Sequence, residues 1–338
     1  MKVIYDPEPR TADEMFSKQD HAAFLRDHDV AVYEGGDRDA FYDLHLPDCE
    51  ILMSQQPMDA ARLARAPKLR AIFNVETNFL PNIDYETCFR RGIHVLAPSG
   101  VFALSVAEMG LGIALSLARG IHSEHVRFLS GHERYGLEGN AEAELLTGST
   151  IGFIGFGDLG RALHALLPGF RPAAVKVYDP WLPDGHLSRL GVEPASLDRV
   201  LSSSRFIFVV ASITTENRHL LNRDKLAMMQ KGACLILLSR AAVLDFEAIT
   251  EFTRSGAIRF ATDVFPEEPV ALGDPIRQEP NILFSPHRAG ALTGALQEIG
   301  KRVLEDVSLI SRGLPPVACR RAERETVMRM RSKPIDKS

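Results

Sequence analysis

The sequence predicts an α/β protein in which a doubly wound parallel sheet is inserted into a second, discontinuous α/β domain. Two observations predict this fold class. Short apolar runs alternate with helical patterns through the first hundred residues, and a second series of the same kind begins at Ile151. Strands that alternate with helices at this spacing are typical of parallel sheets built from βαβ units. A chain of 338 residues is long enough for two domains with sizeable cores.

The first hundred residues combine strand candidates with helices but contain no glycine-rich phosphate loop. Met1–Tyr5 has the pattern of a strand start. Further strands are predicted at 31–33, 50–53, 69–73 and 93–96, and helices at 12–26, 60–65 and 85–91. A long helix over Ser105–Arg119 is apolar around most of its circumference, which suits burial between domains or subunits.

The second series has the more regular alternation. Strands are predicted at 151–154, 175–178, 206–211, 233–238, 259–262 and 282–284, and helices at 158–167, 196–201, 223–229 and 245–255. A final helix over Leu296–Gly313 leads to Pro315-Pro316. If the inserted domain covers 105–294, this helix returns to the first domain, which then comprises 1–104 and 295–338. The basic segment Arg320–Lys337 is predicted to be a solvated end or an edge helix.

Composition and charge argue against several classes of function. The 45% hydrophobic and 25% charged residues are usual for a globular protein, and the net charge of −5 gives no general attraction to nucleic acid or anionic membranes. The longest apolar runs, such as Phe206–Ala211, are too short to cross a bilayer. The cysteines lack the spacing of a zinc site or a disulfide framework, so we expect no metal and a reduced, cytoplasmic setting. They are Cys49, Cys88, Cys234 and Cys319.

A glycine-rich motif directly follows the strand predicted at Ile151–Ile154. Its glycines are Gly155, Gly157 and Gly160. The first allows a tight turn, the second lets the backbone approach a pyrophosphate, and the third lets the following helix pack closely on the strand. The start of that helix offers free N–H groups and the positive end of its dipole to phosphates. The motif therefore predicts a dinucleotide site.

An acidic residue follows at the distance that a dinucleotide site requires. Asp179 ends the next predicted strand, Ala174–Tyr178, about 20 residues past the glycines. A carboxylate there binds both hydroxyls of the adenosine ribose and repels a 2′-phosphate. The following Pro180-Trp181 supplies no cation to offset that repulsion. We therefore expect NAD to be preferred over NADP.

Three polar residues lie at the ends of predicted strands in the second series: Arg240, Glu268 and His287. Ligands of open α/β sheets bind outside the carboxyl ends of the strands, so the three side chains are expected to converge. Hydride transfer to a 2-keto acid requires a forked cation for the carboxylate and carbonyl, and a proton donor for the nascent alkoxide. A carboxylate beside the histidine favours the protonated imidazole and holds one tautomer.

These motifs occur together with others in a characteristic order. They are Ser105–Glu108, Gly155–Arg161, Ser239-Arg240, Asp263–Pro269 and Ser285–His287. On these motifs, the chain from about Ala71 to Val317 resembles the D-isomer-specific 2-hydroxyacid dehydrogenases. The resemblance implies a Rossmann NAD-binding domain inserted into a flavodoxin-like substrate-binding domain. It also implies interconversion of a small-molecule D-2-hydroxy acid and its 2-keto acid, and a homodimer formed through the helix at 105–119.

The resemblance also implies roles for single residues. Arg240 would orient the substrate, Glu268 would support the histidine, and His287 would be the acid and base. Asp263 would hold the carboxamide edge of the nicotinamide, and the backbone of Asp158 and Leu159 would face the pyrophosphate. The residues expected to line the cofactor crevice are Ser105, Ala211, Leu238 and Gly290.

Each assignment has a structural alternative. Arg240 could be a solvated strand end, Asp263 could cap a turn, and His287 could be a histidine satisfied within the core. Glu267 and Glu268 are adjacent, and only the family register selects Glu268.

One loop departs from the family pattern. Small, glycine-rich residues usually precede the Asn82-Ile83-Asp84 turn and bind the substrate carboxylate through their amides. Here the substrate-binding positions are Glu76, Thr77 and Asn78. The Glu76 carboxylate would repel an acid unless it points away or meets a cationic or hydroxylated group. The loop therefore predicts a substrate larger or more polar than lactate or glyoxylate. A second departure, Ala241-Ala242 in place of a glycine after Arg240, leaves the Arg240 side chain unaffected.

Other functions remain open at this point. An NAD(H)-sensing, corepressor-like binding protein with little turnover would keep the nucleotide motif but need a peptide-docking surface. A Rossmann methyltransferase would not require Asp263, Glu268 or His287. A short-chain dehydrogenase would need a Tyr-x-x-x-Lys pair, which the sequence lacks.

Overall fold

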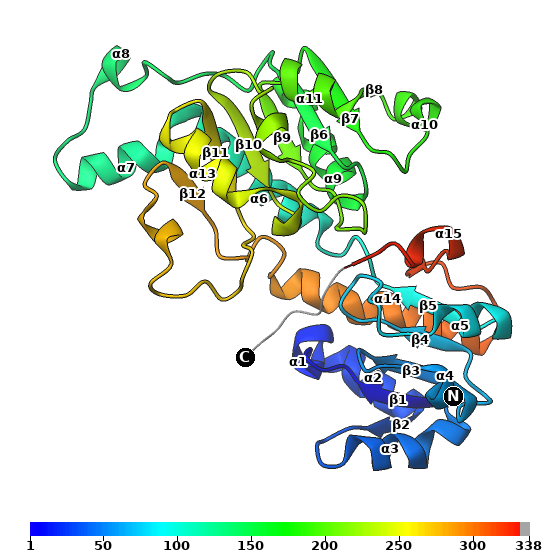
Figure 1. Cartoon of the computed structure of the whole chain (residues 1–338). Helices are drawn as coiled ribbons and strands as arrows, with labels where there is room; N and C mark the ends of the chain where they lie inside the picture. The colour runs from blue at the N-terminus through cyan, green and yellow to red at the C-terminus, as the bar shows by residue number, and fades with distance from the viewer. Residues whose placement is uncertain (332–338) are drawn as a thin grey trace. The chain divides into compact units, whose positions relative to one another are not determined.

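The computed structural model describes residues 1–331 and divides into two compact units (Figure 1). The first unit comprises Met1–Val101 and the chain from Leu292 onward, and the second comprises Phe102–Ala291. These divisions lie a few residues before those predicted at 104 and 294. The predicted α/β class is confirmed, because each unit contains a largely parallel sheet flanked by helices.

The second unit contains a seven-stranded sheet in the order β12-β11-β10-β9-β6-β7-β8, and every neighbouring pair in it is parallel. The strands are β6 (Thr150–Ile154), β7 (Ala174–Tyr178), β8 (Glu193–Pro194), β9 (Phe206–Val209), β10 (Ala233–Leu237), β11 (Ile258–Thr262) and β12 (Ile282–Phe284). The order reverses between β6 and β9, which is the switch point where doubly wound sheets bind their ligands.

Helices cover both faces of this sheet. They are α6 (Ala103–Arg119), α9 (Asp158–Leu166), α10 (Asp184–Arg189), α11 (Leu197–Ser203), α12 (Arg223–Leu226) and α13 (Phe246–Arg254). Alternate residues of β6 and β9 serve two cores: Phe153 and Phe208 stack in one, and Ile154 lies in the other. Strands buried on both faces are continuous apolar runs, as predicted for this half of the chain.

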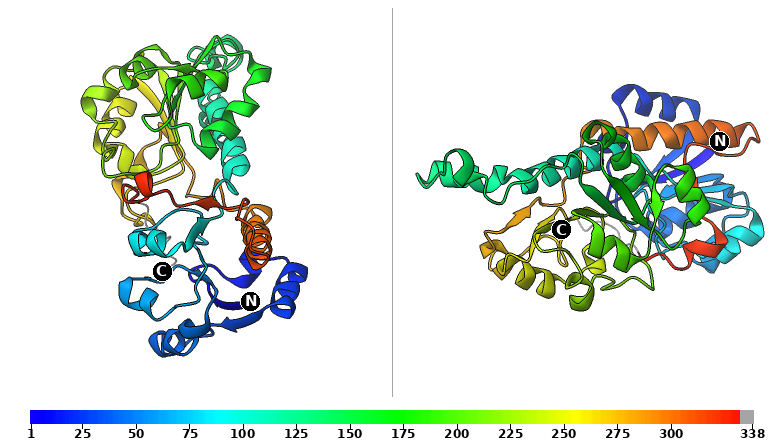
Figure 2. Two further views of the ribbon diagram at one scale, coloured as in Figure 1. Left: turned by 90° about the vertical axis from the view of Figure 1, so that its right-hand side faces the viewer. Right: turned by 90° about the horizontal axis from the view of Figure 1, so that it is seen from above.

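Two further helices, α7 (Ile121–Leu129) and α8 (Gly136–Gly139), project from the body of the second unit (Figures 1 and 2). Gly120 ends α6 in the left-handed conformation, and α7 starts directly after it. Among the described residues no single helix is long and apolar enough to cross a membrane, although α6 and α7, bent by 63°, meet that criterion together by length and composition.

The first unit contains a six-stranded sheet in the order β13-β5-β4-β3-β1-β2. The strands are β1 (Lys2–Asp6), β2 (Asp29–Val32), β3 (Ile51–Ser54), β4 (Ala71–Phe73), β5 (His94–Ala97) and β13 (Arg320–Arg321). Its parallel part has the 2-1-3-4-5 order of flavodoxin-like sheets, as the family resemblance implied. Only β13 is antiparallel, pairing with β5. The segment Arg320–Lys337 was predicted to be a solvated end or an edge helix. It instead begins with this edge strand, which the short helix α15 (Arg324–Val327) follows. Residues 332–337 of the segment lie outside the described residues.

The helices of the first unit are α1 (Ala12–Met15), α2 (Lys18–Asp27), α3 (Arg38–His45), α4 (Ala60–Ala64), α5 (Tyr85–Arg91), α14 (Thr293–Ser311) and α15 (Arg324–Val327). The single helix predicted at 12–26 is wrong, because the chain breaks into two helices. Thr11 caps the first through a capping box with Glu14, and Ser17 caps the second. α14 packs closely on α1, since a Cβ at Gly300 would lie 2.3 Å from the Met15 carbonyl oxygen.

Candidate active site

The glycine motif forms the turn between β6 and α9, and its three glycines differ in what surrounds them. Gly155 has φ +87°, and a Cβ there would lie 2.6 Å from the Ala211 Cα, so only glycine fits this turn. A Cβ at Gly160 would lie 3.1 Å from the Gly155 carbonyl oxygen, which explains the close helix contact. Gly157 faces open space, with nothing within 4 Å of its Cβ position. That open side, at the start of α9, fits a pyrophosphate.

Asp179 lies against this turn. Its Oδ2 accepts a hydrogen bond of 2.8 Å from the Phe156 amide, and its Oδ1 accepts one of 2.9 Å from the Trp181 amide. The carboxylate that the sequence assigned to ribose recognition therefore fixes the glycine turn in the structure. Asp158 and Leu159 occupy the first turn of α9, where backbone N–H groups have no partner within the helix. The Asp158 side chain is paired with Arg161, at 2.6 Å.

The predicted crevice residues lie in the second unit, in different local settings. Ala211 packs against Gly155, and Gly290 packs against Phe102, whose carbonyl accepts a hydrogen bond from Ser105 Oγ at 3.1 Å. Leu238 is buried, and its Cδ1 closely approaches Gly110 of α6. These contacts place Ala211 beside the glycine turn, and they place both Ser105 and Gly290 against Phe102.

Glu268 and His287 are hydrogen-bonded to each other. His287 Nδ1 lies 2.5 Å from Glu268 Oε2, and Glu268 Oε1 accepts a bond of 2.8 Å from the Phe265 amide. Partial burial opposes ionisation of Glu268. The hydrogen bonds from His287 and Phe265, with the charges of His287 and Arg240, outweigh burial and lower the pKa of Glu268. Both side chains are about one-third exposed, at 33% and 32%, so a ligand can reach them.

Arg240 follows β10 and precedes a short 3-10 helix at Ala241–Val243. Its Nη1 donates a hydrogen bond of 2.7 Å to the Ser239 carbonyl. Its charge is also close enough to Glu268 to contribute to the lowered pKa of that carboxyl. The structure thus brings the three predicted residues into one electrostatic group, with a cation, a carboxylate and an imidazole.

Asp263, at the end of β11, braces the backbone that carries His287. Its Oδ1 accepts hydrogen bonds from Ser285 Oγ, at 2.5 Å, and the Arg288 amide, at 3.0 Å, while its Oδ2 accepts from the Ala289 amide at 3.1 Å. His287 itself has φ +47°, a conformation that a non-glycine residue adopts only when its surroundings enforce it. The contacts of Asp263 match the turn-capping alternative and hold the chain on both sides of His287.

In the first unit, the predicted repulsion by Glu76 is relieved by a partner that the sequence did not reveal. Glu76 Oε1 lies 2.8 Å from Arg10 Nε, and both side chains are buried. Neighbouring Thr77 is buried, whereas Asn78 is half-buried. Arg10 is separated from Glu76 by more than sixty residues, and no local pattern connects them. Only its place after β1, at the carboxyl edge of the sheet, could have suggested a role.

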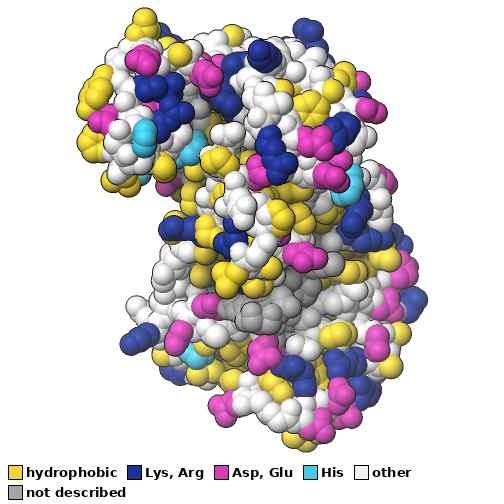
Figure 3. All heavy atoms as spheres, turned by 60° about the vertical axis from the view of Figure 1, so that its left-hand side comes forward, with side chains coloured by type: hydrophobic (Ala, Val, Ile, Leu, Met, Phe, Trp, Pro, Cys, Tyr) yellow, Lys and Arg dark blue, Asp and Glu magenta, His cyan; other side chains and the backbone are white. Residues whose placement is uncertain are grey.

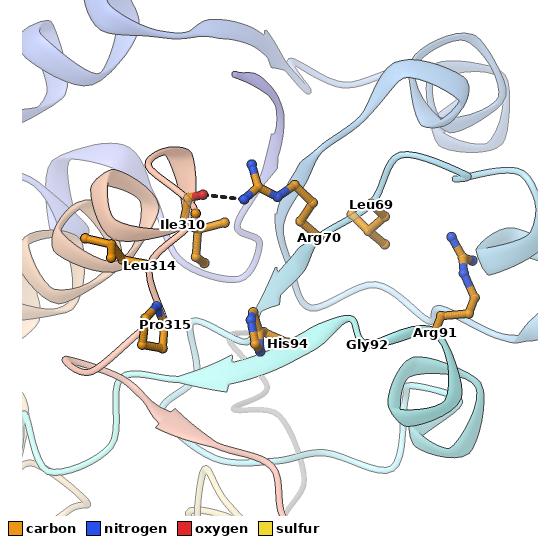
Figure 4. Close-up of a pocket in the computed structure, with 9 residues that line it drawn as sticks. Leu69, Arg70, Arg91, Gly92, His94, Ile310, Leu314 and Pro315 are labelled. Atoms are coloured by element: carbon orange, nitrogen blue, oxygen red, sulfur yellow. Dashed lines mark hydrogen bonds between the residues drawn. The ribbon is translucent and has the colours of Figure 1, made fainter.

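Figure 4 shows a cavity of the first unit, with a volume of about 400 Å³. Arg70 projects into it and donates a hydrogen bond to the Ile310 carbonyl, while His94 lies opposite (Figure 4). Arg70 and His94 stand at the amino ends of β4 and β5. Ligands of such sheets bind at the carboxyl ends, and none of the predicted site residues lines this cavity. In the described residues no cluster of His, Cys, Asp or Glu is placed to hold a metal ion.

Comparison with known proteins identifies the family. Residues 111–289 match the model of the D-isomer specific 2-hydroxyacid dehydrogenase, NAD binding domain. The chain is 35% identical to a hydroxypyruvate reductase of Thermotoga maritima over 236 residues, covering 68% of this chain and 73% of that one. It is 28% identical to a glyoxylate reductase of Korarchaeum cryptofilum, covering 80% and 82% of the two chains.

A solved structure is similar over almost the whole chain. The phosphoglycerate oxidoreductase from Rhizobium etli has 47% sequence identity and a TM-score of 0.89, covering 96% of this chain and 99% of that chain. The family model, the relatives and the geometry of the glycine turn agree. The chain therefore belongs to the D-isomer specific 2-hydroxyacid dehydrogenase family and is an NAD-dependent dehydrogenase.

Proposed function

We propose that this dehydrogenase interconverts a D-2-hydroxy acid and its 2-keto acid, with Arg240, Glu268 and His287 as the catalytic residues. The hydrogen bond of 2.5 Å between His287 and Glu268 is the observation that carries the proposal. It ties up Nδ1 and leaves Nε2 to exchange a proton with the substrate oxygen. NADH, when bound, supplies the hydride to the carbonyl carbon.

The remaining steps follow from the charges of the chain. As the carbonyl oxygen gains the electron pair, the guanidinium of Arg240 stabilises its negative charge and orients the carboxylate. His287 then donates its Nε2 proton to that oxygen, giving the hydroxyl group. The ionised Glu268 stabilises the imidazolium before the transfer and keeps the neutral imidazole in the required tautomer afterwards. In the oxidative direction His287 accepts the same proton.

We propose further that the substrate is larger or more polar than lactate or glyoxylate. The substrate loop has Glu76, Thr77 and Asn78 where small residues are usual, and the buried pair with Arg10 makes this polar loop compatible with an acid. Among the relatives, the hydroxypyruvate reductase and the phosphoglycerate oxidoreductase, at 35% and 47% identity, favour a polar substituent at C3 over the glyoxylate for which the 28% identical relative is named.

Steady-state kinetics with a panel of 2-keto acids tests the proposed substrate class. The panel comprises glyoxylate, pyruvate, hydroxypyruvate, 3-phosphohydroxypyruvate and 2-oxoglutarate, each with NADH. We expect the highest kcat/KM with one of the polar, larger acids. A highest kcat/KM with glyoxylate would refute the argument from the loop. Single-turnover oxidation of NADH separates the enzyme from an NAD(H)-sensing protein, which would bind NADH but show no such oxidation with any acid.

We also propose a homodimer, formed through the projecting helices rather than through α6 alone. α6 packs against α9 within its own unit, so much of its apolar surface is already covered. In contrast, α7 leaves Val126, Phe128 and Leu129 exposed, at 64%, 62% and 73%. Figure 3 shows exposed hydrophobic side chains among charged ones in the upper-left lobe, where α7 and α8 lie. Clustered exposed apolar side chains favour association with a second copy.

A further inference from the structure

The loop that departs from the family pattern follows one strand of the sheet and is held by residues that follow two other strands. Arg10 follows β1, Gln55 follows β3 and Glu76 follows β4, and these three strands are adjacent in the sheet. All three residues therefore stand at the carboxyl edge, where ligands of such sheets bind. Their side chains are buried, although each is polar or charged.

The side chain of Gln55 accepts hydrogen bonds from the first amides of the loop. With its amide oriented so that the oxygen faces the loop, this oxygen accepts from the Val75 amide at 2.6 Å and the Glu76 amide at 2.8 Å. The Gln55 nitrogen then donates to Asn74 Oδ1 at 2.6 Å. Asn82, in the turn that closes the loop, donates to the Gln55 carbonyl at 2.7 Å. Gln55 thus fastens the loop at both ends.

The middle of the loop has a conformation that needs such support. Thr77 has φ +66°, in the left-handed region that a β-branched residue disfavours. The ion pair between Arg10 and Glu76 stands immediately before it, with side-chain exposures of 9% and 4%. Within residues 1–331 no hydrogen bond to another group of the chain uses the amide of Thr77 or Asn78. These amides are the donors left over for a ligand.

We infer that Arg10 is a positioning residue for substrate binding, which acts through Glu76. The ion pair holds the loop in the conformation that leaves the Thr77 and Asn78 amides free, and it cancels the charge that would repel the substrate carboxylate. This inference rests on the proposed function, because it concerns binding of the 2-keto acid. Removing Arg10 leaves a buried, unpaired carboxylate next to those amides, which displaces the loop and repels the acid.

Substitution of the pair tests the inference. Arg10→Gln should raise the KM for the best acid of the panel about tenfold or more, with kcat changed by less than about threefold, because ground-state binding is lost. Its dissociation constant for NADH should stay unchanged. The double variant Arg10→Gln/Glu76→Gln removes both charges, and its KM should return to within about threefold of the wild-type value. Arg65→Gln is the matched control, since Arg65 pairs with Asp43 at the surface of the same unit.

Hydrogen–deuterium exchange gives a readout that does not require turnover. Amides of residues 74–81 should exchange faster in Arg10→Gln than in the wild type or the double variant, with the remainder of the first unit unchanged. Equal KM values for Arg10→Gln and Arg65→Gln, or a double variant no better than Arg10→Gln, would overturn the inference. If Arg10→Gln does not fold, the inference is tested by the KM of the double variant alone. A KM well above the wild-type value would then overturn the inference. If the wild type reduces no acid, the proposed function fails, while loop exchange still shows whether Arg10 holds the loop.

Discussion

His287 Nδ1 lies 2.5 Å from Glu268 Oε2, and the second oxygen of Glu268 is held by the Phe265 amide. The carboxylate is therefore fixed from one side by backbone and fixes the imidazole from the other. Asp263 adds a second constraint by bonding Ser285, Arg288 and Ala289 on both sides of the histidine. A proton donor used at a single carbonyl oxygen needs this restriction, because misorientation lowers the rate steeply.

His287→Asn should reduce kcat by about 10²–10⁴-fold in both directions, because the substrate oxygen loses its proton donor and acceptor. The dissociation constant of NADH, measured by fluorescence titration, should remain near the wild-type value. His164→Asn is the control, since that histidine lies on α9 and packs against Phe156. A loss in kcat of less than tenfold would contradict the assignment of His287 as acid and base.

Glu268→Gln should lower the reductive kcat/KM by about tenfold or more and remove the acid limb of its pH profile, which reports protonation of this carboxylate. The protonated imidazole of His287 is the form that donates the proton. The variant removes the negative charge of Glu268 that stabilises this form. In the wild type the lowered pKa of Glu268 keeps its carboxylate ionised as the pH falls into the range where a glutamic acid is ordinarily protonated. The pair of Glu268 and His287 therefore persists through mildly acidic pH. Glu267→Gln, at the exposed neighbouring position, should leave the profile in place. An identical change of the pH profile in both variants would contradict a specific role for the pair of Glu268 and His287.

Substitution of Asp179 should relax the preference between cofactors. Asp179→Asn removes the charge but keeps an acceptor for the Phe156 amide, whereas Asp179→Ala also removes this brace of the glycine turn. Both should weaken NADH binding more than NADPH binding, by about tenfold in relative terms, and Ala should additionally weaken both cofactors. Titration of each variant with NADH and NADPH gives the ratios. Equal losses for the two cofactors in Asp179→Asn would contradict the ribose assignment.

The sequence predicted those features that depend on local spacing. The glycine turn, the parallel sheet implied by βαβ alternation, and the positions of Glu268 and His287 after their strands are all encoded within short segments. The helix break at Ser17 was also encoded locally, since Ser17 is followed by Asp20 and resembles the start of a new helix, but the apolar pattern over 12–26 concealed it. β8 and β13 were missed because two-residue strands carry no periodicity.

The partners of Glu76 could not be predicted in this way. Arg10 and Gln55 meet the loop only because β1, β3 and β4 are adjacent in the folded sheet. An ion pair between distant loops leaves no periodic or spacing signal in a single sequence. The unexpected carboxylate predicted that Glu76 either points away from the substrate or meets a partner, and only the tertiary structure shows that Arg10 is that partner.

The exposed helix α7 leads to a prediction about assembly. Light scattering of the wild-type protein should give twice the 37.3 kDa mass of the chain. Phe128→Glu or Leu129→Glu places a charge within the apolar side chains of α7 and should shift the mass to that of a monomer at micromolar concentration. Leu272→Glu is the matched control, because Leu272 is 94% exposed in a loop of the same unit and should leave the dimer intact. A wild-type monomer would contradict the proposed homodimer. A dimer that survives both α7 substitutions would instead mean that another surface, such as the remaining face of α6, forms the contact.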